Sequence, residues 1–464
     1  MADLIETQTA PPAASPSAGR APVRPAGRRA HDDVPGPSPA PGDTQRTVVI
    51  VDPVSTGAHL APAFRERGWR AVAVHSRDPL PPVYVKNFRP GDFLETIVHR
   101  GDVAETARRV ARHAPQSVVA GAEPGVALTD ELAERLDLAG NAAASSPARR
   151  DKFAMVEAVR EAGLDHAASL VSQDADELIA WAERGGHWPL VVKPVDSCGS
   201  DSVAFCADAR QVRDAFAHIH RAVNQLGGHN EVVLAQELLV GQQYFINSVS
   251  RDGRHYINEI WKDVRTRLDG GALVYDWEEL VPGDGPEQHR LREYLTGVLD
   301  ALGVRNGPAH SEVMLTARGP VLIESGARIQ GADDPQLHRT ATGTSQVDLT
   351  VQACVDPDSF DVLPGQVYRF EQRLRVVSLI APFDGELAAG AALDELMSLP
   401  TLTGSVRGLR AGTPVRETVD LFSSPDHLAL LDADPAAVAR DYARIRQLER
   451  SGLYRPAREG RDVR

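Results

Sequence analysis

The chain has 464 residues, of which 42% are hydrophobic, enough to bury a large core and to build about two to four domains. Its 64 acidic and 50 basic residues give a formal net charge of -14 at pH 7, which disfavours binding to the phosphate backbone of a nucleic acid. The three cysteines, Cys198, Cys206 and Cys354, are too few and too scattered for a disulfide framework or a four-ligand zinc site. This cysteine usage fits a reducing cytoplasm.

The N-terminus lacks a signal-peptide pattern, and no apolar run approaches the ~18 to 20 residues that cross a bilayer. We therefore expect a cytoplasmic protein without a membrane partner. Residues 1–45 are rich in Pro, Ala, Gly and Ser and have no periodic apolar face, which predicts a disordered leader. The arginines of this segment suggest a transit peptide as an alternative, but acidic residues such as Asp3 and Asp32 disfavour it.

Residues 46–145 are predicted to form a small, doubly wound α/β domain. Their apolar runs and helical patterns, in chain order, predict strand 47–51, helix 59–67, strand 71–74, strand 117–120 and helix 129–136. The loop 52–57 lacks the paired glycines of a dinucleotide-binding fingerprint. A structural or substrate-facing role is favoured for it.

A second domain is predicted over residues 146–350, and a smaller α+β module over residues 351–464. Ser146 is expected to cap a helix whose first turn is preset by Pro147 and which ends at Gly163. The C-terminal module is predicted from strands 375–379 and 412–415 and a helix over 435–450. The predicted fold class is thus α/β and α+β.

A lysine at the end of an apolar strand is the first candidate for chemistry. The strand 188–194 delivers Lys193, and the small residues that follow, among them Ser200, form a loop whose backbone N–H groups could cradle phosphate oxygens. A surface lysine followed by an ordinary turn explains this segment equally well when it is taken alone.

A second candidate is the strand that begins at residue 232 and ends in a polar turn. Backbone groups at the end of this strand could pair with the edge of an adenine, and the next strand, 243–249, could reach a ribose. Taken alone, an ordinary amphipathic strand and turn is the better interpretation of this segment.

The third candidate is a predicted hairpin with strands 310–315 and 320–324, joined by the turn 316–319. It would place Glu312 and Glu324 side by side, a pair that suits Mg²⁺ carrying nucleotide phosphates. Arg328 follows four residues later and could neutralise a transferred phosphoryl group. As isolated residues, they would more often form a solvated face with a weak ion pair.

The order of these segments resembles the ATP-grasp superfamily, and within it the chain is most similar to carboxylate-amine ligases of the L-amino acid ligase type. The resemblance covers roughly residues 47 to 450 and rests on four motifs: Lys193-Pro194, residues 236–241, residues 307–312 and residues 323–328. It implies an ATP-grasp fold with an N-terminal α/β domain, central ATP-binding subdomains and a C-terminal module. Each motif is weak alone, but the ordered set is specific.

The resemblance also implies a role for each matching residue. Lys152 and Lys193 would contact ATP phosphates, Glu312 and Glu324 would bind the metal, and Arg328 would bind the transferred phosphate. The same resemblance places Gln236, Glu237 and Leu239 at the adenine and Gln243 at the ribose. Many members have Glu in place of Gln243 and Asn in place of Gly326, so contacts on the ribose side and on the metal side are expected to differ here.

The implied reaction is the ATP-dependent joining of a small carboxylate and an amine. The carboxylate takes the γ-phosphoryl group of ATP, with Mg²⁺ or alternatively Mn²⁺ present, and the amine then displaces phosphate to form an amide. Lys193 and Arg328 are the expected catalytic residues, and Trp261, Lys262 and His310 are candidates for the substrate pocket. A satisfied structural histidine is the more frequent role for a residue such as His310.

Two other functions are compatible with the same motifs. One is an ATP-grasp carboxylase acting on bicarbonate or an acyl acid, although the chain has no Met-Lys biotin carrier motif. The other is a non-catalytic nucleotide-binding protein with a decayed metal site, which Gly326 suggests and the retained Glu312, Glu324 and Arg328 oppose. The oligomeric state stays open, with a homodimer as one alternative.

Overall fold

The computed structural model describes residues 46–80, 87–197, 201–268, 273–421 and 423–456. The predicted disordered leader, residues 1–45, lies outside the described residues. Residues from Gln45 onward form one compact unit. No helix in the described part of the chain is long and apolar enough to cross a membrane.

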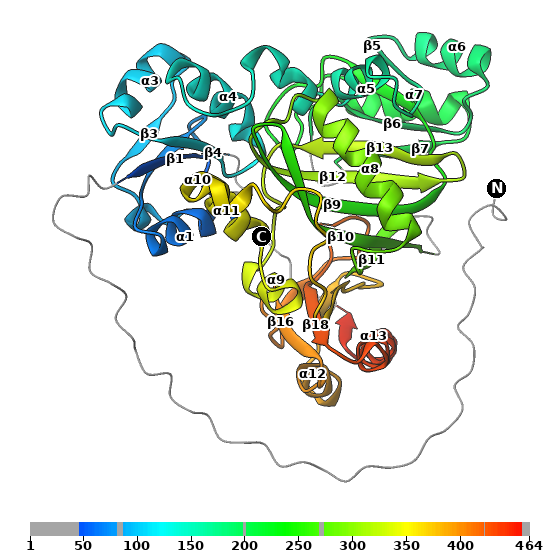
Figure 1. Cartoon of the computed structure of the whole chain (residues 1–464). Coiled ribbons are helices and arrows are strands. Elements are labelled where there is room, and N and C mark those ends of the chain that lie inside the picture. The colour runs from blue at the N-terminus through cyan, green and yellow to red at the C-terminus, as the bar shows by residue number, and fades with distance from the viewer. Residues whose placement is uncertain (1–45, 81–86, 198–200, 269–272, 422, 457–464) are drawn as a thin grey trace, which may run out of the picture. The chain divides into compact units, whose positions relative to one another are not determined.

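The first part of this unit is a parallel four-stranded sheet in the order β3-β2-β1-β4 (Figure 1). Its elements are β1 Thr47–Val51, η2 Ser55–His59, α1 Leu60–Glu66, β2 Arg70–His75, η3 Pro90–Asp92, β3 Thr96–Val98, α3 Val103–Ala111, β4 Ser117–Ala120, η4 Glu123–Gly125 and α4 Val126–Arg135. The β-branched strand β1 is buried along its whole length, with Val48 and Ile50 packed on one core and Val49 and Val51 on another. The predicted doubly wound arrangement is therefore confirmed.

A second, antiparallel sheet has the order β5-β8-β6-β7 and packs against two amphipathic helices. Its elements are α5 Lys152–Glu161, which precedes it, β5 Ser169–Ser172, α6 Ala175–Gly185, β6 Leu190–Pro194, β7 Ala204–Cys206, α7 Ala209–Ile219 and β8 Val233–Glu237. Buried Leu178 and Val212 join the helices to the strands. The predicted lysine strand and hinge strand are neighbours in this sheet.

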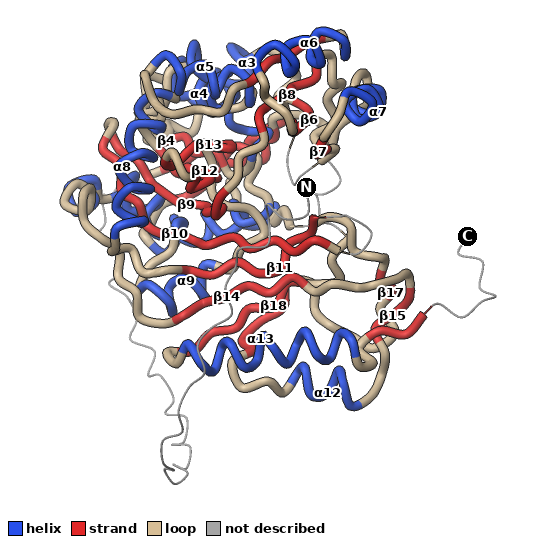
Figure 2. Tube along the Cα trace, turned by 90° about the vertical axis from the view of Figure 1, so that its right-hand side faces the viewer, coloured by secondary structure: helices blue, strands red, loops and turns tan. Residues whose placement is uncertain are grey.

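An eight-stranded antiparallel sheet follows in the order β13-β12-β9-β10-β11-β14-β18-β16. Its strands are β9 Gly241–Arg251, β10 Arg254–Arg267, β11 Leu273–Leu280, β12 Gly307–Thr316, β13 Gly319–Gly326, β14 Arg373–Ser378, β16 Leu402–Ser405 and β18 His427–Asp432. Strands predicted in two different domains thus share one sheet, visible in Figure 2 as strands lying side by side. The domain boundary at residue 350 stays a prediction, and the sheet continues across it.

Six helices and a small three-stranded sheet complete the described fold. The helices are α8 Pro286–Ala301, α9 Pro335–Thr342, α10 Gln346–Val355, α11 Pro357–Phe360, α12 Ala391–Met397 and α13 Pro435–Arg450, and the small sheet has the order β17 Pro414–Val415, β15 Gly385–Leu387 and β19 Tyr454–Pro456. Helix α13 has the predicted bounds. It packs through Val438 and Ile445 onto the core under β14 and β18.

The predicted start of the helix after residue 146 was wrong. Pro147 lies inside a separate 3-10 helix, η5 Ala143–Arg149, and α5 begins later with Asp151 as its cap. Ser146 instead donates a hydrogen bond to Asp130 Oδ2 at 2.8 Å, and Arg149 pairs with the same carboxylate at 2.7 Å. A buried ion pair therefore decides the path of the chain here, and the local capping pattern does not.

This Asp130–Arg149 pair allows a test of the fold. Both side chains are almost fully buried, so Asp130→Asn leaves the arginine charge uncompensated, and we expect a loss of about 3 to 5 kcal/mol in the free energy of unfolding. Urea denaturation followed by circular dichroism measures it. Asp214→Asn, which breaks an exposed pair with Arg210 in α7, should change stability by at most about 0.5 kcal/mol. Equal losses in the two variants would contradict the prediction.

Candidate active site

The two predicted metal-binding glutamates lie opposite each other on neighbouring strands. Glu312 of β12 is the direct partner of Glu324 of β13, next to an irregularity in the strand pairing. Directly opposed residues of antiparallel strands project from the same face of the sheet. Burial, followed by the charge of Glu324, raises the pKa of Glu312 to about 7. Simultaneous ionisation of Glu312 and Glu324 is therefore unfavourable, and a bound cation would make it more favourable.

Two lysines from outside this sheet approach Glu324. Lys152 opens α5, and its Nζ lies 3.0 Å from Glu324 Oε2 and donates to the Ser197 carbonyl at 2.7 Å. Lys193, at 5% exposure, comes from β6. Burial opposes the charge of Glu324, but these two lysines lower the pKa of Glu324 to about 2. The predicted lysines and glutamates therefore form one cluster.

Burial and the neighbouring charges also shift the pKa values of the two lysines. Burial lowers the pKa of Lys193 to about 8, and the nearby Lys152 acts in the same direction. The pKa of Lys152 rises because the attraction of Glu324 outweighs its burial. Lys193 shares Glu324 with Lys152, so a further anion such as a phosphate would favour the charged form of Lys193.

The strand register extends this face of the large sheet beyond the glutamate pair. Glu312 pairs with Phe245 of β9, and two residues along β9 Gln243 pairs with Asp263 of β10, which in turn pairs with Glu278 of β11. Gln243 Nε2 donates to Glu312 Oε2 at 2.9 Å. Gln243, predicted at a ribose, is thus placed beside a metal-ligand candidate, and its ribose role stays a prediction.

Asp263 and Glu278 are two further acidic residues of this face that the sequence patterns did not reveal. Asp263 is 4% exposed, and its Oδ2 pairs with Arg265 at 3.2 Å. Burial, followed by the charge of Asp263, raises the pKa of Glu278 to about 8. Only the cross-strand register could have shown that these two acids meet, because they lie on separate strands.

Arg328 lies just beyond β13 and contacts Glu123 of η4, which follows the N-terminal sheet. Its Nε donates to Glu123 Oε2 at 2.9 Å, and both side chains are mostly buried. Arg150 lies on the other side of the same carboxylate, with Nη1 3.5 Å from Glu123 Oε1. Neither Glu123 nor Arg150 was predicted as a site residue, because no local motif marks them.

His310 lies on the same face as Glu312 but is neutral. Burial lowers its pKa to about 3, and the positive charge of Arg328 acts in the same direction. Its Nδ1 lies 2.8 Å from the side-chain oxygen of Asn247. A neutral imidazole can donate or accept a hydrogen bond, but it offers no charge to a substrate carboxylate.

Trp261 and Lys262 are adjacent in sequence but project to opposite faces of β10. Trp261 is 1% exposed and stacks on Phe245 with ring centroids 5.3 Å apart. Lys262 pairs in register with Tyr244 and Glu279, and its Nζ lies 6.0 Å from the Trp277 ring centroid. The structure does not bring Lys262 together with His310 or the glutamates.

The predicted adenine hinge is the segment that links the two antiparallel sheets. Gln236 and Glu237 end β8, and Leu239 follows in the connection to β9. The side chains of the first two residues have partners of their own, since Gln236 Nε2 donates to Ser169 and Glu237 pairs with Arg318. Any contact with a base would therefore use backbone groups, as predicted. Ser200 of the predicted phosphate loop lies outside the described residues.

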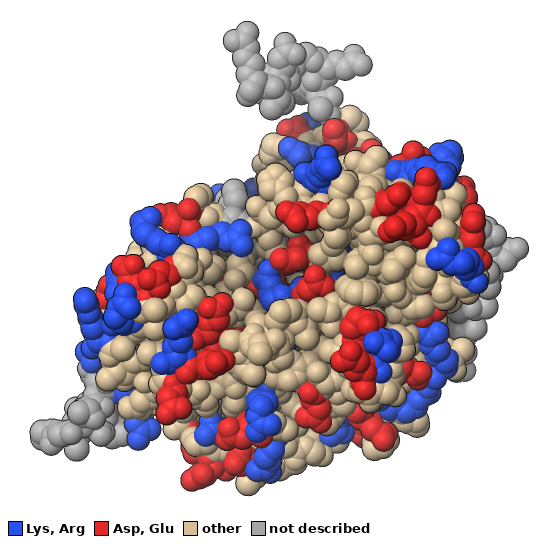
Figure 3. Space-filling model, turned by 90° about the horizontal axis from the view of Figure 1, so that it is seen from above, with Lys and Arg blue, Asp and Glu red and all other residues tan. Residues whose placement is uncertain are grey.

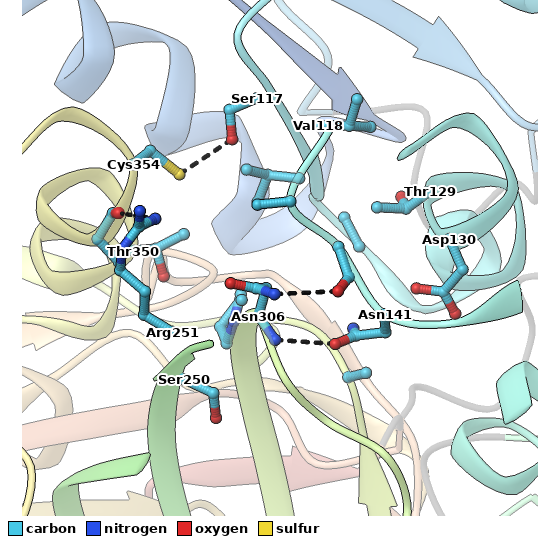
Figure 4. A pocket seen from close by; sticks show the side chains of 18 of the residues that line it. Ser117, Val118, Thr129, Asp130, Asn141, Ser250, Arg251, Asn306, Thr350 and Cys354 are labelled. Atoms are coloured by element: carbon cyan, nitrogen blue, oxygen red, sulfur yellow. Dashed lines mark hydrogen bonds between the residues drawn. The ribbon is translucent and has the colours of Figure 1, made fainter. Parts of the chain in front are cut away.

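Seen from above, the surface is hollowed near the middle of the view, where acidic and basic side chains adjoin (Figure 3). A separate small cavity lies between β4, α4, α10 and the start of β12 (Figure 4). Its described walls include none of the predicted site residues. One of its polar groups, Asn141 Oδ1, accepts hydrogen bonds from the backbone of Arg305 and Asn306 at 2.7 and 2.8 Å and so joins neighbouring segments.

Comparison with known proteins places this geometry in a family. Residues 187–334 match the ATP-grasp domain model. Dapdiamide A synthase of Enterobacter agglomerans is 30% identical over 412 residues, which cover 88% of this chain and 96% of that protein. This chain belongs to the ATP-grasp family of carboxylate-amine ligases. It is an ATP-dependent ligase that forms carbon–nitrogen bonds, and neither the carboxylase nor the non-catalytic alternative is favoured.

Solved structures agree on the fold of the ligase. The L-amino acid ligase of Bacillus licheniformis superposes with a TM-score of 0.67 at 18% identity, covering 87% of this chain and 97% of that one. The N5-carboxyaminoimidazole synthase of Aspergillus clavatus, solved with ADP and its ribonucleotide, gives 0.61 at 14% identity, covering 88% and 99%. The predicted ATP-grasp fold is thereby confirmed.

The raised pKa of Glu312 predicts how the stability of the ligand-free ligase depends on pH. A carboxyl group whose pKa is raised from 4.5 in the unfolded chain to about 7 in the fold contributes stability below pH 4.5 and loses it as the pH rises through 7. Glu312→Gln should therefore unfold about 2 °C or more above the wild type at pH 8 and show little difference at pH 5. Scanning calorimetry without nucleotide or Mg²⁺ measures both.

Glu161→Gln, at an exposed position of α5, is the control and should follow the wild type at both pH values. A melting difference between Glu312→Gln and the wild type that is the same at pH 5 and pH 8 would argue against the raised pKa.

Proposed function

We propose that the ligase joins two amino acids, or an amino acid and a related amine or carboxylate, through an acyl phosphate and releases ADP and phosphate. One observation carries this proposal: Glu312 and Glu324 lie opposite each other, and Glu324 is flanked by Lys152 and Lys193. Two carboxylates beside two ammonium groups suit a metal-bound triphosphate, because each anion finds a cation.

The paired glutamates also fit Mg²⁺ as the metal. Mg²⁺ takes one or two protein carboxylates and completes its shell with water and phosphate oxygens, and Glu312 and Glu324 are two such carboxylates directly opposite each other. No larger group of potential metal ligands occurs among the described residues. We propose that Glu312 and Glu324 hold the ion, which would neutralise charge on the phosphates when bound.

ATP would lie between the small antiparallel sheet and the large one. Backbone groups from residue 237 to 239 would face the adenine, and Lys152 and Lys193 would bind phosphate oxygens. This arrangement rests on the hinge segment, which joins β8 of one sheet to β9 of the other. The γ-phosphoryl group would then lie near Glu312, Glu324 and Arg328.

The chemistry would proceed in two substitutions. A carboxylate oxygen of the first substrate attacks the γ-phosphorus, the bond to the β-phosphate oxygen breaks, and ADP leaves. The ammonium group of the second substrate first loses a proton to solvent, and the amine attacks the carbonyl carbon of the acyl phosphate. The bond to the phosphate oxygen breaks, phosphate leaves, and a second proton passes from the nitrogen to solvent, which gives the neutral amide. Arg328 and the two lysines would stabilise the charge of the transferred group, so catalysis rests on positioning and electrostatics.

The names of the related proteins support the substrate class. One relative is a dapdiamide synthase and one structural neighbour is an L-amino acid ligase. A cationic ammonium group near Asp263 and Glu278, on the same sheet face as Glu312, would offset the burial and the neighbouring charge that raise the pKa of Glu278. We also propose that the ligase acts in the cytoplasm, where the thiols of Cys206 and Cys354 stay reduced.

The proposed site predicts the outcome of two substitutions. Lys193→Ala and Glu324→Ala should each lower kcat/KM for ADP release at least about 100-fold, because Lys193 would bind phosphate oxygens and Glu324 would hold the metal ion. The assay supplies MgATP with pooled L-amino acids and identifies the amide by mass spectrometry. ADP release that needs bicarbonate would point to a carboxylase instead.

Arg210→Ala and Glu161→Ala, at exposed positions, are matched controls for the loss of one positive or one negative charge, and both should keep wild-type activity. Full amide formation by Lys193→Ala or Glu324→Ala would remove these residues from the site.

A further inference from the structure

Glu123 reaches the active site from a distant part of the chain. It stands in η4, directly after β4, yet its carboxylate accepts a hydrogen bond from Arg328 Nε at 2.9 Å. The side chains of Glu123 and Arg328 are only 13% and 16% exposed. An ion pair so shielded from solvent fixes the orientation of the guanidinium better than an exposed pair does.

Gly326 provides the space that this carboxylate occupies. A Cβ atom at residue 326 would lie 2.6 Å from Glu123 Oε2, closer than Cβ atoms approach in real structures. The backbone of Gly326 does not have a positive φ, so its conformation is open to other residues. A glycine at this position is therefore explained by the space that the Glu123 carboxylate occupies, and not by a backbone conformation that only glycine adopts. A larger residue here, such as asparagine, would displace the Glu123 carboxylate.

A second arginine holds Glu123 from the other side. Arg150 approaches Glu123 Oε1 at 3.5 Å and also donates to the backbone carbonyl of Glu123. Its Nη2 lies 2.8 Å from Asp196, which follows the strand of Lys193. Alternating charges thus connect the start of the predicted phosphate loop with Arg328, and Glu123 is the link between the two arginines.

We propose that Glu123 is a positioning residue, which holds the Arg328 guanidinium at the transferred phosphoryl group, and that residue 326 is glycine to admit it. This inference rests on the role of Arg328 proposed above. Its physical basis is preorganisation: a guanidinium already fixed by a buried partner needs no rearrangement when charge develops on the phosphoryl group. Glu123 itself acts through Arg328, since its carboxylate already faces two arginines.

A double-mutant cycle tests whether Glu123 acts through Arg328. The four proteins are the full-length wild type, Glu123→Ala, Arg328→Ala and the double variant. Calorimetric titrations with MgADP and with the Mg²⁺ complex of a non-hydrolysable ATP analogue give the preference for a γ-phosphate, and kcat is taken from amine-dependent ADP release. We expect Arg328→Ala to lower both quantities about tenfold or more and Glu123→Ala about three- to tenfold, while the double variant matches Arg328→Ala.

The outcomes separate this inference from the proposed function. If Glu123→Ala lowers the γ-phosphate preference by the same factor with and without Arg328, the positioning role is overturned. If the wild type releases no ADP with any amino acid, the proposed function fails, while the nucleotide titrations still decide the role of Glu123. Glu95→Gln is the control. It removes a carboxylate next to β3 that pairs with Arg109 of α3, and it should leave the preference for a γ-phosphate unchanged.

Gly326→Ala tests the space itself. In the wild-type background, the added methyl group should push the carboxylate away and lower the γ-phosphate preference about as much as Glu123→Ala does. In the Glu123→Ala background, the same methyl group should have little further effect, because the nearest remaining atoms, Arg328 Cζ and Nε, lie at 3.4 Å. Full preference in Gly326→Ala, or a further loss of the same size in the double variant, would refute the explanation of the glycine.

Discussion

The placement of Glu312 directly opposite Glu324 is the constraint on which the rest of the site depends. Like charges at a direct cross-strand position oppose folding, and burial increases the cost. Burial and the charge of Glu324 raise the pKa of Glu312, whereas Lys152 and Lys193 outweigh burial and lower the pKa of Glu324, which favours one ionised carboxylate beside two lysines. A metal-bound triphosphate would supply the missing positive charge together with an anion for the lysines.

The surrounding elements supply the charges that this pair requires. Lys152 is placed by the cap of α5, Lys193 by the end of β6, and Arg328 by the turn that follows β13. These elements belong to different sheets and helices, so the site exists only when they are packed together. A loss of packing between them would therefore cost activity before it unfolds any single sheet.

The N-terminal sheet takes part in the site as well as supporting it. Besides Glu123, its loop 52–57 contacts the chain beyond Arg328: Ser55 Oγ accepts from the backbone N–H of Ala332 and Thr56 Oγ1 from that of Asp333, both at 2.9 Å. This agrees with a structural role for the loop. Gly57 lets the end of this loop pack closely against Gly121, the residue after β4. A Cβ atom at position 57 would lie 2.2 Å from the Gly121 carbonyl oxygen.

Much of the fold was determined by local sequence signals, because apolar periodicity and glycine turns specify strands and helices over short stretches. Strand β1, helix α13 and the β12–β13 hairpin were predicted in this way, and the hairpin alone brought Glu312 to Glu324. The order of the motifs along the chain also predicted the ATP-grasp family. The start of α5 was missed because the buried Asp130–Arg149 pair, 19 residues apart, overrides the local capping pattern.

Only the tertiary structure decided which side chains share a face and which distant groups meet. Strand alternation sends Lys262 away from its neighbour Trp261, and the register aligns Asp263 with Glu278. The contact of Glu123 with Arg328 joins residues 205 positions apart. No local pattern encodes such a contact, since it results from the packing of two sheets and from the space left by one glycine.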